Sequence, residues 1–151
     1  IYGMLGEWEK GIQYGNAALR DGPSDPNLYA NLGTLYFRKN EFNRAAEYLE
    51  LAVRGGTNDD GVAVEGIPLS YDLSTIETYS RYGLAMARIN NCSQAVTIAN
   101  ALLSTVADND NAVYNANEIL TICEDNMLNP PTATPAPTPT TVTGPTATAQ
   151  P

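Results

Sequence analysis

Apolar side chains recur at intervals of three and four residues along most of the first 129 positions, a spacing typical of amphipathic helices. The periodic segments stop at residues that favour turns, such as Gly22-Pro23 and Asn90-Asn91. Asp25 and Ser93 stand where helix N-caps are expected. The pattern predicts helices near residues 7–20, 26–39, 42–54, 72–90, 93–105 and 112–126.

One interval between the predicted helices has a different pattern. Residues 55–72 read GGTNDDGVAVEGIPLSYD and are rich in glycine and polar side chains. Within them, Val62, Val64 and Ile67 alternate with smaller or polar positions, as expected of extended backbone. The sequence therefore predicts a short extended or hairpin segment inserted between two helix pairs.

The segments around Gly33 and Gly83 share an arrangement of small, aromatic and aliphatic residues. When Leu32-Gly33 is aligned with Tyr82-Gly83, similar positions recur at matching offsets, which indicates an internal repeat. After its glycine, the first copy has Tyr36, Asn40, Phe42, Ala45, Leu49 and Ala52, and the second has Met86, Asn90, Cys92, Ala95, Ala99 and Leu102.

The first copy, YANLGTLYFRKNEFNRAAEYLELAV, resembles a tetratricopeptide repeat, and YSRYGLAMARINNCSQAVTIANALL looks like a second, looser copy. The family signature is Trp-x-x-Leu-Gly-x-x-Tyr with later alanines; Tyr29 replaces the tryptophan here, while Leu32-Gly33, Tyr36, Ala45 and Ala52 match. The resemblance implies an all-α solenoid of helical hairpins over residues 1–129, with 55–72 as an insertion like those of bacterial envelope proteins of this family. It implies no enzymatic activity.

Both ends of the repeat array look incomplete. The chain opens with the last turn of a first-type helix before a second-type helix, and it finishes with a first-type helix at 112–126 that has no partner. Because the chain begins at Ile1 rather than Met, we expect it to be a processed product or part of a longer chain. Three interpretations follow: a window on a longer solenoid, two ends that complete each other between copies, or a monomer with atypical caps.

If the two ends complete each other, their apolar residues form the contact, which is head-to-tail and therefore builds an open filament unless it closes a ring. We expect these self-assembly residues to be Tyr2, Met4, Leu5, Trp8, Ile12, Val113, Ile119, Leu120 and Ile122.

The repeat arrangement gives the two cysteines a meaning. Cys92 lies in the turn that joins two helices, and Cys123 lies near the end of the next first-type helix, which finishes at the same edge of such an array. Neighbouring helices pack about 8–10 Å apart, and a disulfide needs Cα atoms within about 7 Å. We predict a Cys92–Cys123 disulfide, which implies an oxidising, extracytoplasmic location.

The last 22 residues, PPTATPAPTPTTVTGPTATAQP, hold no charged side chain and consist mainly of threonine and proline. This composition favours extended polyproline II backbone and resembles O-glycosylated stalks, although a plain linker has a similar composition. The candidate O-glycosylation sites are Thr132, Thr134, Thr138, Thr140, Thr141, Thr143, Thr146 and Thr148.

Charge and composition exclude several classes of function. The net charge of −9 argues against binding to nucleic acid or anionic membranes, and no apolar run is long enough for a membrane span. The chain contains no histidine, so the usual general base and zinc ligand are missing. We interpret the acidic pairs Asp59/Asp60 and Asp108/Asp110 as loop and cap residues rather than catalytic or calcium-binding groups.

Some tetratricopeptide domains hold a partner's terminal carboxylate with Asn, Lys and Arg on their inner helices. Asn31 and Arg81 fall at two matching positions, but Glu77 stands where that group has lysine. The resemblance therefore gives a carboxylate clamp little support.

Taken together, these patterns predict an all-α, tetratricopeptide-like helical-hairpin solenoid at 1–129 and an extended Thr/Pro-rich tail at 130–151. We expect a non-enzymatic structural subunit of an extracellular or cell-surface filament, with no cofactor or metal, that assembles with copies of itself and carries glycans on its tail. The alternative is an envelope-tethered module that binds a peptide or protein partner.

Overall fold

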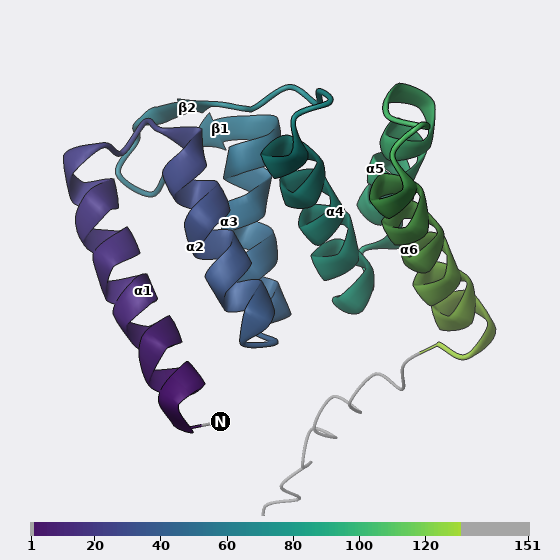
Figure 1. The fold of residues 1–151 in the computed structure, drawn as a ribbon, viewed down its shortest axis with the longest axis horizontal. Helices are drawn as coiled ribbons and strands as arrows, with labels where there is room; N and C mark the ends of the chain where they lie inside the picture. Colours follow the sequence, from purple (N-terminus) through teal and green to yellow (C-terminus); the bar gives the residue numbers. More distant parts are fainter. Residues whose placement is uncertain (1, 131–151) are drawn as a thin grey trace, which may run out of the picture.

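The computed structural model describes residues 2–130, with side chains from residue 6 onward. These residues are mostly helical, and consecutive helices pack against one another in a row that runs from α1 to α6 (Figure 1). The elements in chain order are α1 (Tyr2–Asp21), α2 (Pro26–Arg38), α3 (Phe42–Arg54), β1 (Gly55–Thr57), β2 (Ala63–Glu65), α4 (Leu73–Arg88), α5 (Cys92–Thr105) and α6 (Asp110–Leu128).

Short polar side chains start three of these helices. The Asp25 carboxylate accepts a hydrogen bond from the Asn27 backbone N–H at the start of α2, and Asp72 accepts one from the N–H of Thr75 in α4. Asn109 caps α6 in the same way. The predicted cap at Ser93 is wrong: α5 begins one residue earlier, after Asn91, which makes no side-chain cap hydrogen bond.

The α2–α3 and α4–α5 turns are built alike. Asn40 and Asn90 both have φ of 62°, a left-handed conformation that asparagine tolerates better than most residues. The next N–H in each turn reaches back in the same way, from Glu41 to the Tyr36 carbonyl at 3.0 Å and from Asn91 to the Met86 carbonyl at 2.8 Å. These matching turns place the two predicted repeat copies in equivalent helical hairpins.

The repeat glycines allow close helix contact. A Cβ atom at Gly33 would lie 2.5 Å from Leu49 Cγ, and one at Gly83 would lie 2.5 Å from Ile119 Cδ1. Real Cβ atoms do not approach carbon atoms so closely, so α2 approaches α3, and α4 approaches α6, more tightly than any side chain would permit. Ala45 and Ala95 occupy matching positions with no exposed surface, as close packing between paired helices requires.

The insertion forms the predicted hairpin. β1 and β2 pair antiparallel, with Gly56 opposite Val64, and Val64 is buried against Tyr29 and Ala52. The segment that follows is anchored as well, because the Tyr79 hydroxyl donates a hydrogen bond to the Ile67 carbonyl at 2.6 Å. The hairpin and this segment run over the ends of α2 and α3 towards the start of α4 (Figure 1).

The start of the chain differs from the prediction. We expected the end of one helix followed by a second helix, but Tyr2–Asp21 is a single helix. A glycine such as Gly6 costs a helix interior only about 1 kcal/mol relative to alanine, and no proline interrupts the stretch. Glycine alone therefore does not end the helix.

Candidate functional site

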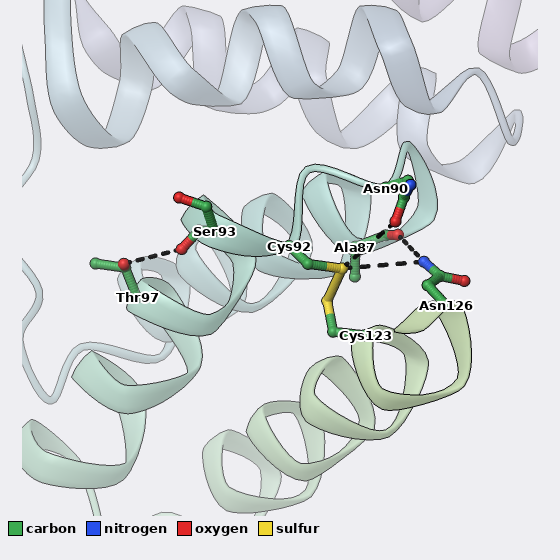
Figure 2. Close-up of a disulfide and its surroundings, with 7 residues drawn as sticks. All are labelled: Ala87, Asn90, Cys92, Ser93, Thr97, Cys123 and Asn126. Atoms are coloured by element: carbon green, nitrogen blue, oxygen red, sulfur yellow. Dashed lines mark hydrogen bonds between the residues drawn. A yellow bond between two sulfur atoms is a disulfide. The ribbon is translucent and has the colours of Figure 1, made fainter. Parts of the chain in front are cut away.

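The predicted disulfide is confirmed. Cys92, the first residue of α5, bonds to Cys123 on α6, with their Cα atoms 5.6 Å apart. Beside it, the Asn126 side-chain amide donates a hydrogen bond to the Ala87 carbonyl at 3.2 Å (Figure 2). Together these contacts fasten α6 to the α4–α5 turn. A disulfide of this kind is consistent with an oxidising compartment.

The apolar residues of α6 lie mostly inside the chain. Ile119 has no exposed surface and packs against Gly83, so it is not accessible to another copy and its assignment as a self-assembly residue is wrong. Val113, Leu120 and Ile122 are half-buried, and the last two pack against the core. The reason is that α6 contacts both α4 and α5, which together cover its apolar stripe.

The predicted self-assembly residues of α1 divide into three groups. Ile12 is buried within the chain, which corrects its assignment, whereas Trp8 is half-buried. The side chains of Tyr2, Met4 and Leu5 lie outside the described residues. Among the described side chains of α1, Ile12 is the only buried apolar one.

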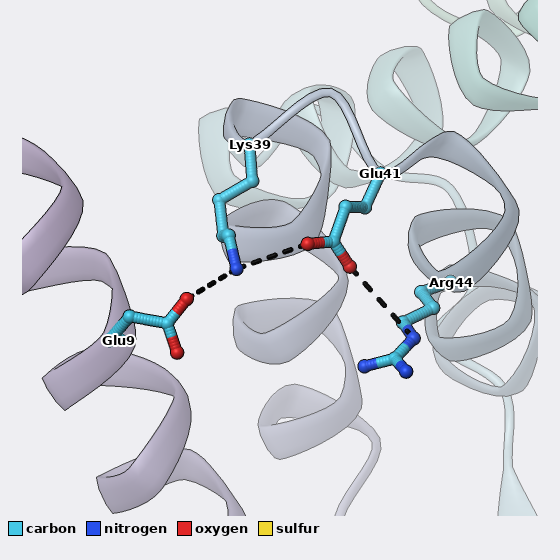
Figure 3. A network of polar contacts seen from close by, with 4 residues as sticks. All are labelled: Glu9, Lys39, Glu41 and Arg44. Atoms are coloured by element: carbon cyan, nitrogen blue, oxygen red, sulfur yellow. Dashed lines mark hydrogen bonds and ion pairs between the residues drawn. The ribbon is translucent and has the colours of Figure 1, made fainter.

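Polar contacts help to hold α1 in place. The Lys39 ammonium, just after α2, pairs with Glu9 of α1 and with Glu41 of the next turn at 3.0 Å (Figure 3). Arg44 extends the network, with its Nε 3.8 Å from the other oxygen of Glu41. The hydrogen bonds to Glu9 and Glu41 raise the pKa of Lys39 above its usual 10.5.

The exposed apolar side chains gather on the two end helices. Tyr14 of α1 is 74% exposed, while Tyr114, Met127 and Leu128 of α6 are 69%, 81% and 72% exposed. Our sequence-based set of self-assembly residues contains none of the four. Tyr14 and Tyr114 stand off the apolar stripes of their helices, so an aromatic residue at a polar helical position was the signal that could have found them.

The residues considered for a carboxylate clamp are engaged differently. Arg81 pairs with Glu77 one helical turn away, with the guanidinium 3.4 Å from the carboxylate, whereas Asn31 is exposed on α2. The Arg81 guanidinium is thus already paired with Glu77, whereas a clamp would need it for the carboxylate of a ligand. This geometry adds no support to a clamp.

The acidic pairs lie in loops and helix ends. Asp59 and Asp60 are exposed in the hairpin loop, and Asp108 and Asp110 flank the capping residue Asn109. Within residues 2–130, no three His, Cys, Asp or Glu side chains converge closely enough to hold a metal ion.

A cleft of about 930 Å³ lies between the end of α1, the outer side of α3 and the hairpin loop. We call it the hairpin cleft. Among the side chains that line it are Arg20, Glu47, Tyr48, Asn58, Asp59 and Asp60. The sequence did not predict this cleft.

A hydrogen-bonded chain fixes the walls of the hairpin cleft. The Tyr29 hydroxyl donates to the Pro23 carbonyl at 2.7 Å and accepts from the Asn58 amide at 3.1 Å. The Asn58 side-chain oxygen Oδ1 in turn accepts hydrogen bonds from the backbone N–H groups of Asp60 and Val62, at 3.0 Å and 2.8 Å. The hairpin loop is therefore tied to the α1–α2 turn.

Tyr48 is a half-buried residue on the lining of the hairpin cleft. Its ring stacks on Tyr36, with centroids 5.3 Å apart and planes 13° from parallel. Burial is the main cause that raises the pKa of the Tyr48 hydroxyl, and the neighbouring Tyr36 and the negative charges of Glu47 and Asp59 raise it further.

No family model, curated protein or solved structure matches this chain. The resemblance to tetratricopeptide repeats therefore remains an expectation from the sequence motif. None of the described helices combines the length and apolar character needed to cross a membrane. The candidate O-glycosylation sites from Thr132 to Thr148 lie outside the described residues.

Proposed function

We propose that this chain is a non-catalytic structural subunit of an extracellular filament. In this proposal its helical repeats stack head to tail between copies, and its Thr/Pro-rich tail carries O-linked sugars. The proposal keeps the self-assembly predicted from the sequence but moves the contact to different side chains.

One observation carries the proposal. Within the described residues, four of the six large apolar side chains that are highly exposed lie on α1 or α6, the two ends of the helical row. Exposed aromatic residues are enriched where proteins meet partners, because they bury much area while losing little conformational freedom. The side of α1 that carries Tyr14 and the exposed positions Tyr114, Met127 and Leu128 of α6 are the proposed contact surfaces.

The two surfaces differ from each other, which determines the kind of assembly. A contact between α6 of one copy and α1 of the next leaves one free surface of each kind at the ends of the dimer, so growth continues. The filament is open unless the rotation per subunit closes a ring.

The test uses the native protein with its disulfide intact. Light scattering and electron microscopy should show polymers whose length grows with concentration. Tyr14→Asp and Tyr114→Asp should each prevent polymerisation when alone, because a charge at the centre of a contact is left without water or a partner. Mixed together, the two variants should form dimers and nothing larger, because each keeps one intact surface.

Tyr71→Asp is the matched control, since Tyr71 is 64% exposed but precedes α4, away from both end helices. It should polymerise like the unmodified protein. A native protein that stays monomeric at every concentration, or a Tyr71→Asp variant as defective as the other two, contradicts the proposal.

Glycosylation is tested separately by mass. The C-terminal peptide released from native material should be heavier than its sequence by whole hexose units, with the added mass on the threonines from Thr132 to Thr148. An unmodified peptide would contradict the glycosylation part of the proposal but not the filament part.

A second function is supported by a different observation. The hairpin cleft is a hydrogen-bonded concave site of about 930 Å³, close to the upper end of the range of about 300–1,000 Å³ for ligand sites. It supports the alternative of an envelope-tethered module that binds a peptide or protein partner.

A further inference from the structure

The hairpin cleft has an excess of negative charge. Glu47, Asp59 and Asp60 are exposed on its lining, and none of the three forms an ion pair within the part of the chain that the structure describes. Glu50 also lines the cleft but is paired with Arg54 at 3.2 Å. Arg20 is the only basic residue among the lining residues.

The same cleft offers an aromatic surface. Tyr48 is half-buried and held in place by stacking on Tyr36, so its ring is fixed before any ligand arrives. Cations are attracted to the faces of aromatic rings, and the attraction strengthens where water is partly excluded. Carboxylates beside a fixed tyrosine ring suit the ammonium or guanidinium group of a side chain.

The spread of the charges distinguishes a peptide from a metal ion. Glu47 comes from α3, whereas Asp59 and Asp60 come from the hairpin loop, and these carboxylates do not converge into a metal-binding group within the described residues. Charges that come from two separate elements of the cleft match separate cationic side chains on an extended chain.

We propose that the hairpin cleft binds an extended peptide segment that carries lysine or arginine side chains, with Glu47, Asp59 and Asp60 pairing with its charges and Tyr48 packing against its side-chain stems. This inference rests on the second candidate function and is independent of the filament. The Thr/Pro-rich tail at 130–151 carries no charge, so it is not this peptide.

The test measures fluorescence anisotropy with a labelled Gly-Lys-Gly-Lys-Gly-Lys peptide, and with its Gly-Glu counterpart as a control. The protein used in this test, called the host, carries Tyr14→Asp. This change keeps copies separate if the filament proposal is right, and it lies outside the cleft lining in either case. We expect the lysine peptide to bind, the glutamate peptide not to bind, and affinity to fall as salt rises.

Three changes in the cleft test its assignment. The double variant Glu47→Gln with Asp59→Asn should weaken binding about tenfold. A tenfold change corresponds to roughly 1.4 kcal/mol, and the two lost charge contacts together account for it. Tyr48→Leu should weaken binding because it removes the aromatic ring, whereas Tyr48→Phe keeps the ring and should bind like the protein with Tyr48. Arg20→Gln should strengthen binding about threefold, an increase that a misfolded variant would not show.

The matched control is Glu124→Gln with Asp125→Asn, which removes the same charge from exposed positions on α6. It should bind the lysine peptide like the host. Absence of binding at low salt, equal weakening by the α6 control, or weaker binding after Arg20→Gln would overturn the proposal. Spermine that competes as well as the peptide would overturn the assignment to a peptide.

Discussion

The two end helices, α1 and α6, are held by different forces. α6 buries Ala112, Ala116, Ile119 and Cys123 and is bonded covalently to α5. α1 is of similar length, yet among its described side chains it buries only Ile12, and Lys39 ties it to the rest of the chain through Glu9. One end of the row is therefore fixed by extensive apolar packing and a disulfide. The other is fixed by one buried isoleucine, by the close contact of Gly15 with Leu32 and by charge.

This difference bears on assembly. Burial of apolar surface stabilises a helix far more than an exposed ion pair does. We infer that α1 is the more adaptable of the two ends, since fewer of its contacts need to change when a partner docks. In the proposed filament, α6 is then the rigid surface and α1 is the surface that adjusts to it.

The largest difference between the two ends should appear when their buried isoleucines are shortened. Ile119→Ala should lower the free energy of unfolding by about 4 kcal/mol, near the upper end of the range for such changes, because Ile119 is enclosed by α4 and α5. Ile12→Ala should cost about 2 kcal/mol, because α1 can shift into the space. Chemical denaturation of the two variants checks this, and equal losses would refute the contrast.

Removal of the disulfide should come next in size. With Cys92 and Cys123 separated by 31 residues, Cys92→Ser with Cys123→Ser should cost about 3.7 kcal/mol by the loop-entropy relation. Hydrogen exchange should rise first and most in α6, and less in α2 and α3. Faster exchange in α1 instead would show that the disulfide does not act on its own end of the row.

Glycine substitutions give a sharper and smaller contrast. A Cβ at Gly83 would meet Ile119 and Ile98 at 2.5 Å and 3.1 Å, in a helix packed on several sides, so Gly83→Ala should cost about 2 kcal/mol. A Cβ at Gly15 would meet Leu32 Cδ2 at 2.6 Å, but α1 is free to move outward.

The gain in helix propensity, about 1 kcal/mol, should then leave Gly15→Ala close to neutral. Thermal unfolding of the two variants measures both effects. As an internal check, Ile119→Val should partly rescue Gly83→Ala, because it removes the methyl group that the new Cβ meets. Purely additive losses would show that the clash is not the cause.

Local patterns in the sequence predicted much of the fold, and long-range contacts were the part they missed. Helical periodicity and the repeat glycines located the helix pairs, and the repeat arrangement brought Cys92 and Cys123 together. The hairpin cleft depends on Asn58 reaching Tyr29, 29 residues earlier, a contact with no signature in either segment. The role of Ile119 was likewise misjudged, because apolar residues on an end helix do not reveal which neighbours cover them.

The smallest expected effect concerns the ionic link of α1. Lys39→Met should loosen α1, and Trp8, the only tryptophan of the chain, lies on that helix and reports the change through quenching by acrylamide. Acrylamide should quench Trp8 more strongly in Lys39→Met than in the unmodified protein. This difference should shrink with added salt, because salt screens the charges and weakens the Glu9–Lys39 contact in the unmodified protein.

The same link should depend on pH in one direction. The pKa of Lys39 is raised in the folded state, so its contribution is complete below the ordinary value of 10.5 and disappears as the pH rises through the folded pKa. Trp8 quenching in the unmodified protein should therefore approach that of Lys39→Met only under strongly alkaline conditions. Comparison with the variant at each pH cancels the ionisation of tyrosines, which affects both proteins alike. If the two proteins converge already near neutral pH, the Glu9–Lys39 contact does not hold α1, and Ile12 together with the glycine contacts positions that end of the row.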